Sequence, residues 1–159
     1  GPGFTAGVDV DAVIETKRGH QLGRILWQGT AIANTGIPGL IAGYGKERVI
    51  HSPQAGFVYG LVHIGDKVKK GQPMAVLTKD KIPVGTTVTE TMGIAVPASL
   101  TGFVRGLIRD GYYVPQGFKM ADIDPRDDER ENCFTISDKA RSLGGAVLTA
   151  LLWMGREDF

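Results

Sequence analysis

The chain has 159 residues, of which 42% are hydrophobic and 22% are charged, and its formal net charge at pH 7 is +1. This composition fits one ordinary globular domain, and the near-zero charge argues against nucleic acid as a ligand, because nucleic-acid-binding surfaces carry an excess of Lys and Arg. No run of about 18 apolar residues and no signal-like start is present, so we expect no membrane span and a cytoplasmic protein. The single cysteine, Cys133, cannot form an internal disulfide, which agrees with a reducing compartment.

The first 50 residues are rich in glycine. They predict loops around short strands near residues 12–16, 23–28 and 47–51. The chain opens with Gly1 and Pro2 in place of an initiator methionine, so we expect it to be part of a longer protein.

Three basic residues, Arg18, His20 and Arg24, lie close together in this part of the sequence. Such a cluster can bind a phosphate or a carboxylate, and it is a candidate cofactor-binding site; a solvated loop is the alternative. No phosphate-binding glycine motif accompanies it. His20, His51 and His63 lack the spacing of metal ligands, so we expect no metal site.

An internal repeat is the strongest signal in the sequence. Residues 56–77 align with residues 102–123 at an offset of 46, with ten identities in 22 positions. Each copy predicts strand, turn, strand, turn, strand, with Val68 and Val114 as inward-facing apolar residues. Three pairs of glycines mark the turns: Gly56 and Gly102, Gly65 and Gly111, and Gly71 and Gly117. The first of these pairs, Gly56 and Gly102, is expected to need positive φ.

Strands this short cannot bury a face alone, so the two copies are expected to pack on each other about a pseudo-twofold axis. The run P-x-x-G-F-V followed by I-G-D-x-V-x-x-G-Q resembles the half-motif of biotinyl and lipoyl carrier domains. The resemblance implies a mainly β fold, a barrel-sandwich hybrid built from two pseudo-twofold repeats, with a C-terminal α-helix. We expect strands and loops over 1–50, the two-repeat module over 51–126 and an acidic connection with the helix over 127–159, together forming one compact domain.

Carrier domains of this kind present a modified lysine on the hairpin between their halves. The resemblance places Lys81 at that position, about ten residues after Gly71. The sequence IPVG that follows Lys81 differs from that of lipoyl and biotinyl domains, and the connection to the second repeat is longer. Two hypotheses stay open: Lys81 carries an acyl or biotinyl group, or it is an ordinary solvated lysine.

Residues 136–154 predict an amphipathic helix. Thr135 and Asp138 have the spacing of a capping box, and apolar residues follow at helical spacing: Ala140, Leu143, Val147, Leu148, Leu151 and Leu152. Gly144 and Gly145 either weaken this helix or let another backbone approach closely. Cys133 precedes the helix and is the one candidate catalytic nucleophile, because helix amides favour a thiolate; a buried structural cysteine is the alternative.

Blocks of sequence spread along the chain carry a wider resemblance: GPGFTAGVDVDAVIET with RGHQLGR, NTGIPG, GYGKERVIHSP, GFVRGLIRDG and CFTISDKARSLGGAVL. Through them the chain resembles accessory proteins of the selenium-dependent molybdenum hydroxylase system, the YqeB-type family. The resemblance implies a role in maturing or supporting a hydroxylase and supplies no catalytic residues. It favours an accessory module over an enzyme, with no bound cofactor and only an indirect link to the molybdenum cofactor or selenium.

Two functional hypotheses follow. In the first, the chain docks on the hydroxylase, on a maturation protein or on the cofactor through its glycine-rich loops and the cluster of Arg18, His20 and Arg24. In the second, it is a carrier, with sulfur or selenium on Cys133 or an acyl or biotinyl group on Lys81. Exposed β edges would also allow a homo-oligomer.

Overall fold

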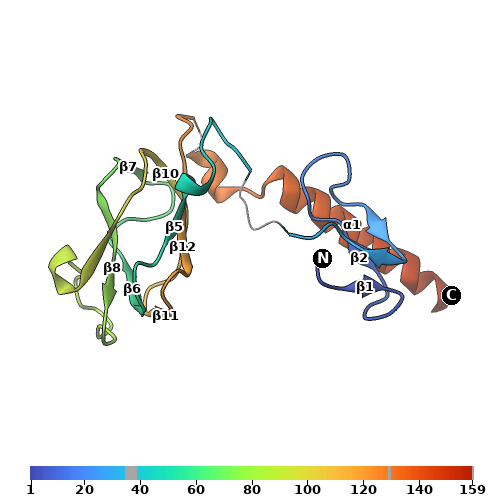
Figure 1. Cartoon of the computed structure of the whole chain (residues 1–159), viewed down its shortest axis with the longest axis horizontal. Coiled ribbons are helices and arrows are strands. Elements are labelled where there is room, and N and C mark those ends of the chain that lie inside the picture. Colours follow the sequence, from blue (N-terminus) through green and yellow to red (C-terminus); the bar gives the residue numbers. More distant parts are fainter. Residues whose placement is uncertain (35–38, 129, 159) are drawn as a thin grey trace. The chain divides into compact units, whose positions relative to one another are not determined.

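The computed structural model describes residues 1–34, 39–128 and 130–158 (Figure 1). The chain divides into two compact units. Unit 1 combines Gly1–Ile37 with Ile136–Phe159, and unit 2 is the continuous segment Pro38–Thr135. The ranges expected from the sequence follow chain order, whereas the units do not, because the N-terminal strands share a unit with the C-terminal helix.

Unit 1 contains four strands of two residues each. Strands β1 (Thr5–Ala6) and β4 (Gly29–Thr30) form one antiparallel pair, and β2 (Val13–Ile14) and β3 (Ile25–Leu26) form another. The predicted strands near 12–16 and 23–28 are confirmed by β2 and β3, whereas β1 and β4 were not predicted. The small core of this unit consists of Ala6, Val13 and Ala31, with Val10 and Leu26 packed against it.

Helix α1 (Asp138–Met154) confirms the predicted C-terminal helix and contacts β2, as Figure 1 shows. The predicted capping box is wrong: the N-cap is Ser137, whose hydroxyl accepts the amide of Ala140 at 3.1 Å, while the Thr135 hydroxyl donates to the carbonyl of Asn132. The helix is followed by the short 3-10 helix η4 (Gly155–Asp158). Among the described residues, no helix is both long and apolar enough to cross a membrane.

Unit 2 consists of two four-stranded antiparallel sheets. The first has the order β5-β12-β10-β7 and the second β11-β6-β8-β9. Their bounds, in chain order, are β5 (Val49–His51), β6 (Gly56–Gly60), β7 (Lys67–Val68), β8 (Pro73–Thr78), β9 (Ile94–Pro97), β10 (Gly102–Leu107), β11 (Tyr112–Val114) and β12 (Lys119–Asp124). Three 3-10 helices lie outside the sheets: η1 (Lys46–Arg48), η2 (Glu90–Met92) and η3 (Glu131–Phe134).

The described residues are therefore mainly β, with 12 strands in antiparallel sheets and one C-terminal α-helix. This confirms the predicted fold class at that level. Within the described ranges the strands do not close into a barrel, because each sheet ends in two edge strands.

The core of unit 2 is formed by inward side chains of both sheets. Val68 and Val114, predicted to face inward, have no exposed surface, and Met74 and Met120 are buried as well. Each fully buried side chain of this size contributes roughly 1.5 to 3 kcal/mol relative to leaving it exposed. The core residues are Ile50, Val58, Val62, Val68, Met74, Ala75, Leu77, Val96, Ala98, Leu100, Val104, Val114, Met120, Ala121 and Ile123.

The paired glycines of the repeat have two different structural roles. The second and third pairs have positive φ, between +71° and +90°, as turns require: Gly65, Gly71, Gly111 and Gly117. The prediction for the first pair is wrong, because Gly56 and Gly102 begin strands and their φ angles are not positive. Glycine is needed there for space: a Cβ at Gly56 would lie 2.9 Å from the carbonyl oxygen of Thr78, and one at Gly102 would overlap that of Asp124.

Candidate functional site

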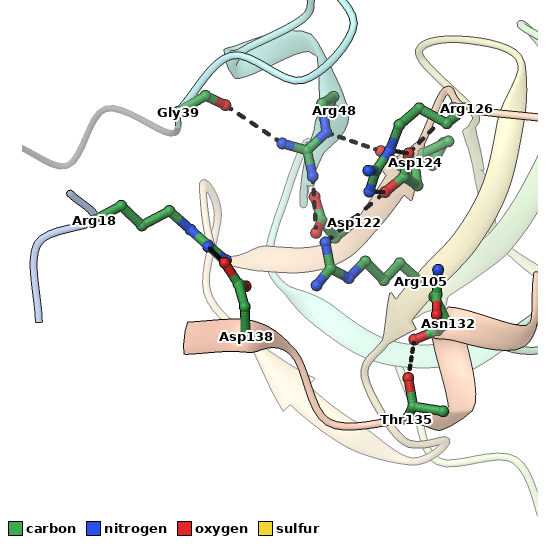
Figure 2. Close-up of polar contacts among 11 residues, drawn as sticks. Arg18, Gly39, Arg48, Arg105, Asp122, Asp124, Arg126, Asn132, Thr135 and Asp138 are labelled. Atoms are coloured by element: carbon green, nitrogen blue, oxygen red, sulfur yellow. Dashed lines mark hydrogen bonds and ion pairs between the residues drawn. The ribbon is translucent and has the colours of Figure 1, made fainter. Parts of the chain in front are cut away.

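The predicted basic cluster lies on the surface of unit 1. Arg18 forms an ion pair with Asp138, the first residue of α1, and its Nη1 donates to both carboxylate oxygens at 2.8 and 2.7 Å (Figure 2). Arg24 donates to the side-chain oxygen of Gln21 at 3.1 Å, and His20 is exposed. The carboxylate that Arg18 meets thus belongs to the chain itself. Binding of an external ligand by these residues stays a prediction.

Lys81 lies in the loop between β8 and β9 and is exposed. Its ammonium lies 5.7 Å from the centre of the Phe57 ring. The loop is held by Tyr59, whose hydroxyl accepts the amide of Ile82 at 2.7 Å. Lys81, Tyr59, Ile82 and Asp110 are among the residues that line a hollow of about 420 Å³.

Cys133 is half-buried and lies in η3, at the C-terminal end of unit 2. Helix α1 begins at Asp138 and belongs to unit 1. The thiol and the amides of α1 therefore belong to different units, and an effect of these amides on the thiol stays a prediction. The nucleophilic role of Cys133 stays a prediction.

A network of three arginines and two aspartates joins β10, β12 and η1 in unit 2, and Figure 2 shows its side chains. Arg48, 5% exposed, donates from Nε to the carbonyl of Ile123 at 3.3 Å, and its Nη2 lies 3.4 Å from Asp122 Oδ2. Asp124, 1% exposed, accepts from Arg126 Nε at 3.0 Å and Nη2 at 2.8 Å. The network therefore pairs buried charges with charged partners, as interior ions require.

The electrostatics of Asp124 follow from these contacts. Burial raises the pKa of its carboxyl, but hydrogen bonds from the side chain and backbone of Arg126, together with the charges of Arg126 and Arg48, outweigh burial, and the pKa is lowered from 3.8. Arg105 lies 3.8 Å from the same carboxylate. Every charge in this network has a partner within the chain, which is typical of a structural role.

Two pairs of aromatic rings lie at the edge of the second sheet, one on each face of strand β11. Tyr113 is paired with Phe57 of β6, and the two rings meet edge to face with their centres 5.2 Å apart. Tyr112 points to the opposite face, since successive strand residues alternate, and its ring centre lies 6.3 Å from that of Phe118. The guanidinium of Arg109 lies 5.6 Å from the centre of the Tyr112 ring.

We call the two sets together the aromatic surface; it consists of Phe57, Tyr113 and Lys81 on one face of the β11 edge, and of Tyr112, Phe118 and Arg109 on the other face. Tyr113 is 55% exposed, Tyr112 40% and Phe118 37%. Large aromatic rings that remain exposed to solvent do not gain the stabilisation that burial would give. Exposed apolar patches often mark protein interfaces, and Tyr, Phe and Arg are enriched there. Cations over ring faces add the ability to attract carboxylates. This surface is therefore suited to bind another protein.

Sequence reasoning identified only Lys81 of this surface. One signal was available in the repeat: at the offset of 46, Tyr112 and Tyr113 stand where the first copy has Asp66 and Lys67. Two adjacent aromatic residues in place of two charged ones distinguish the second copy of the sequence repeat from the first. No group of three or more His, Cys, Asp or Glu side chains that could hold a metal ion occurs in the described part of the chain.

The chain is 47% identical over 154 residues to the uncharacterized protein YqeB of Escherichia coli (strain K12). The match covers 97% of the chain, and the chain spans 26% of the length of that relative. This similarity supports the YqeB-type family expected from the sequence. No protein-family model matches the chain.

Three solved structures show a lower similarity to part of the chain. An aspartoacylase family protein from Mesorhizobium loti is 22% identical with a TM-score of 0.40, covering 52% of this chain and 24% of that protein. The ectoine utilization protein EutE (DoeB) from Ruegeria pomeroyi is 18% identical with a TM-score of 0.38, covering 49% and 22%. A succinylglutamate desuccinylase from a Silicibacter species is 17% identical with a TM-score of 0.37, covering 61% and 27%. TM-scores this low do not establish a common fold.

Proposed function

We propose that this chain is a non-catalytic docking module that supports the maturation of a selenium-dependent molybdenum hydroxylase. The aromatic surface is the part that binds the hydroxylase or one of its maturation proteins. The observation that carries this proposal is the exposure of Tyr112 and Tyr113 on an edge strand, beside two cations that lie over aromatic rings. Exposed tyrosines of this kind contribute binding energy because they bury a large rigid ring and retain a hydroxyl for hydrogen bonding.

The proposal includes the fold of unit 2 as a two-repeat barrel-sandwich hybrid. Four strand pairs support it, because at the offset of 46 the strands β6 and β10, β7 and β11, β8 and β12, and β5 and β9 occupy corresponding positions. Exchanging these partners converts the order β5-β12-β10-β7 into β9-β8-β6-β11, which is the order of the second sheet. In each sheet the short strand of one copy also pairs with the first strand of the other. The aromatic surface then occupies one of two equivalent edges.

Replacing Tyr113 by alanine is expected to weaken binding to the purified hydroxylase by at least about tenfold, since a buried interface tyrosine is a typical hot spot. Isothermal titration calorimetry with the full chain measures this change, and Tyr112→Ala is expected to act in the same direction. Tyr44→Ala is the matched control, because Tyr44 is a tyrosine of unit 2 that is 44% exposed outside the aromatic surface.

Three results would count against this proposal. If the wild-type chain binds neither the hydroxylase nor its maturation proteins, the docking function is wrong. If Tyr113→Ala and Tyr44→Ala weaken binding equally, the aromatic surface is not the binding site. If Arg24→Ala or His20→Ala abolishes binding while Tyr113→Ala does not, docking uses the basic cluster of unit 1 instead.

A carrier function is the second candidate, and one observation favours it: Lys81 is exposed on the loop that joins the two copies of the repeat. Intact-protein mass spectrometry of the chain from its native host, with peptide mapping, tests it. A lipoyl or biotinyl mass on Lys81, or sulfur or selenium on Cys133, would establish a carrier. Lys79 is the matched control, because it is exposed on the same loop. We expect unmodified masses, since docking alone needs no attached group.

A further inference from the structure

Helix α1 buries its small residues and exposes its large apolar ones. Ala146 and Ala150 are buried, with 8% and 5% exposed surface, whereas Leu148, Leu151 and Leu152 are 59%, 58% and 64% exposed. A helix whose packing is complete within its own chain buries leucines before alanines, because a leucine removes more apolar surface from water. A contiguous set of exposed leucines is typical of a protein contact surface.

This exposed face is continuous along the helix and carries no charge. At 100° per residue its members lie within one half of the helix circumference. No Asp, Glu, Lys or Arg occurs between residues 142 and 155. The one hydroxyl in the second half of the helix, that of Thr149, donates to the carbonyl of Gly145 at 2.9 Å. We call the set the apolar face; it comprises Gly144, Gly145, Val147, Leu148, Leu151, Leu152 and Met154.

We propose that the apolar face binds the same face of a second copy of this chain, in an antiparallel helix pair whose twofold axis passes by Leu148. In this arrangement Leu152 of one copy lies opposite Gly144 of the other, and Leu151 lies opposite Gly145, because each pair is symmetric about position 148. Beside both glycines the space is open, with no neighbouring atom within 4 Å of an added Cβ. Large side chains therefore meet small ones, and the two helices can approach closely.

The area of the apolar face agrees with a small stable dimer. Val147, Leu148, Leu151, Leu152 and Met154 are each between 36% and 64% exposed. With about 100 Å² of exposed surface per side chain, complete burial of these five in both copies removes about 1,000 Å² in total, which is the lower limit expected of a specific interface. Because the face is uncharged, pairing identical copies brings no like charges together and desolvates no ion. This dimer concerns unit 1 and is independent of the docking function proposed for unit 2.

Sedimentation equilibrium of the full chain across the micromolar range tests the dimer. The expected result is a molar mass twice that of the 17.0 kDa chain. Leu148→Glu places two carboxylates at the twofold axis and is expected to raise the dissociation constant at least about 100-fold. Val8→Glu is the matched control, because Val8 is an apolar residue of unit 1 that is 80% exposed outside the apolar face; it should leave the dissociation constant unchanged.

A second variant separates pairing from folding. Gly144→Leu improves helix propensity but fills the space that Leu152 of the other copy needs, so the dissociation constant should rise about tenfold while the helical circular dichroism is retained. Leu148→Cys in a Cys133→Ser background should form a disulfide-linked dimer on mild oxidation, whereas Leu40→Cys should not. A chain that stays monomeric at every concentration overturns the proposal, and so does a dimer that Leu148→Glu and Gly144→Leu leave intact.

Discussion

Replacing Gly102 by alanine is expected to lower the free energy of unfolding of unit 2 by about 3 kcal/mol, because the added methyl group would overlap the carbonyl oxygen of Asp124 and lie 2.9 Å from Ile123 Cγ2. Both contacts belong to β12, the central partner of β10, so the two strands must separate to admit the methyl group. Urea unfolding followed by circular dichroism measures the change.

Gly106→Ala is the control for Gly102→Ala. Gly106 lies in the same strand, and the nearest neighbour of its added Cβ is the Cβ of Asp122 at 4.0 Å, which is an ordinary contact. The two tryptophans, Trp27 and Trp153, lie in unit 1, so tryptophan fluorescence reports that unit separately. Equal midpoints for Gly102→Ala and Gly106→Ala would contradict the steric explanation.

Replacing Asp124 by asparagine is expected to destabilise unit 2 by about 2 kcal/mol at pH 7, because a nearly isosteric change removes the negative charge that Arg126 and Arg105 share. The pKa of Asp124 is lowered in the folded chain, so its carboxylate contributes stability above the unfolded value of 3.8 and loses it as the pH falls through the folded pKa. The difference between wild type and Asp124→Asn should therefore shrink below about pH 3.8.

Urea unfolding at pH 7 and at pH 3 measures both parts of this prediction. Asp127→Asn is the control, because Asp127 is 84% exposed and its ion pair with Lys67 lies in solvent. Surface pairs of this kind contribute at most about 1 kcal/mol. A pH-independent difference between wild type and Asp124→Asn would show that the charge of Asp124 does not carry the effect.

The repeat allowed the sequence to predict much of unit 2, and its errors have a physical origin. Glycine at 65, 71, 111 and 117 was correctly read as a turn residue. The same reading failed at Gly56 and Gly102, because a glycine can be required either by its own backbone angles or by an opposing carbonyl. Only the pairing of β6 with β8 and of β10 with β12 brings those carbonyls close. Sequence patterns report local geometry and do not report pairing across a sheet.

The prediction of helix α1 from the sequence was limited in a similar way. Its position was predicted well, but apolar spacing identified a face without telling whether the protein core covers it. Val147, Leu148, Leu151 and Leu152 have the spacing of a core face and are exposed, whereas the less conspicuous Ala146 and Ala150 are buried. The aromatic surface was missed for a further reason: Phe57 and Tyr113 are 56 positions apart, and only the register of β6 with β11 joins them.

Unit 1 is assembled from two segments that are separated by roughly a hundred residues of unit 2. A ribosome adds about 5 to 20 residues per second, so the first 37 residues leave it about 5 to 20 s before α1 does. By the end of that interval every strand of unit 2 has been synthesised, whereas β2 still lacks the helix that contacts it. Order of synthesis thus favours completion of unit 2 first, and the first segment must remain without its helix until α1 emerges.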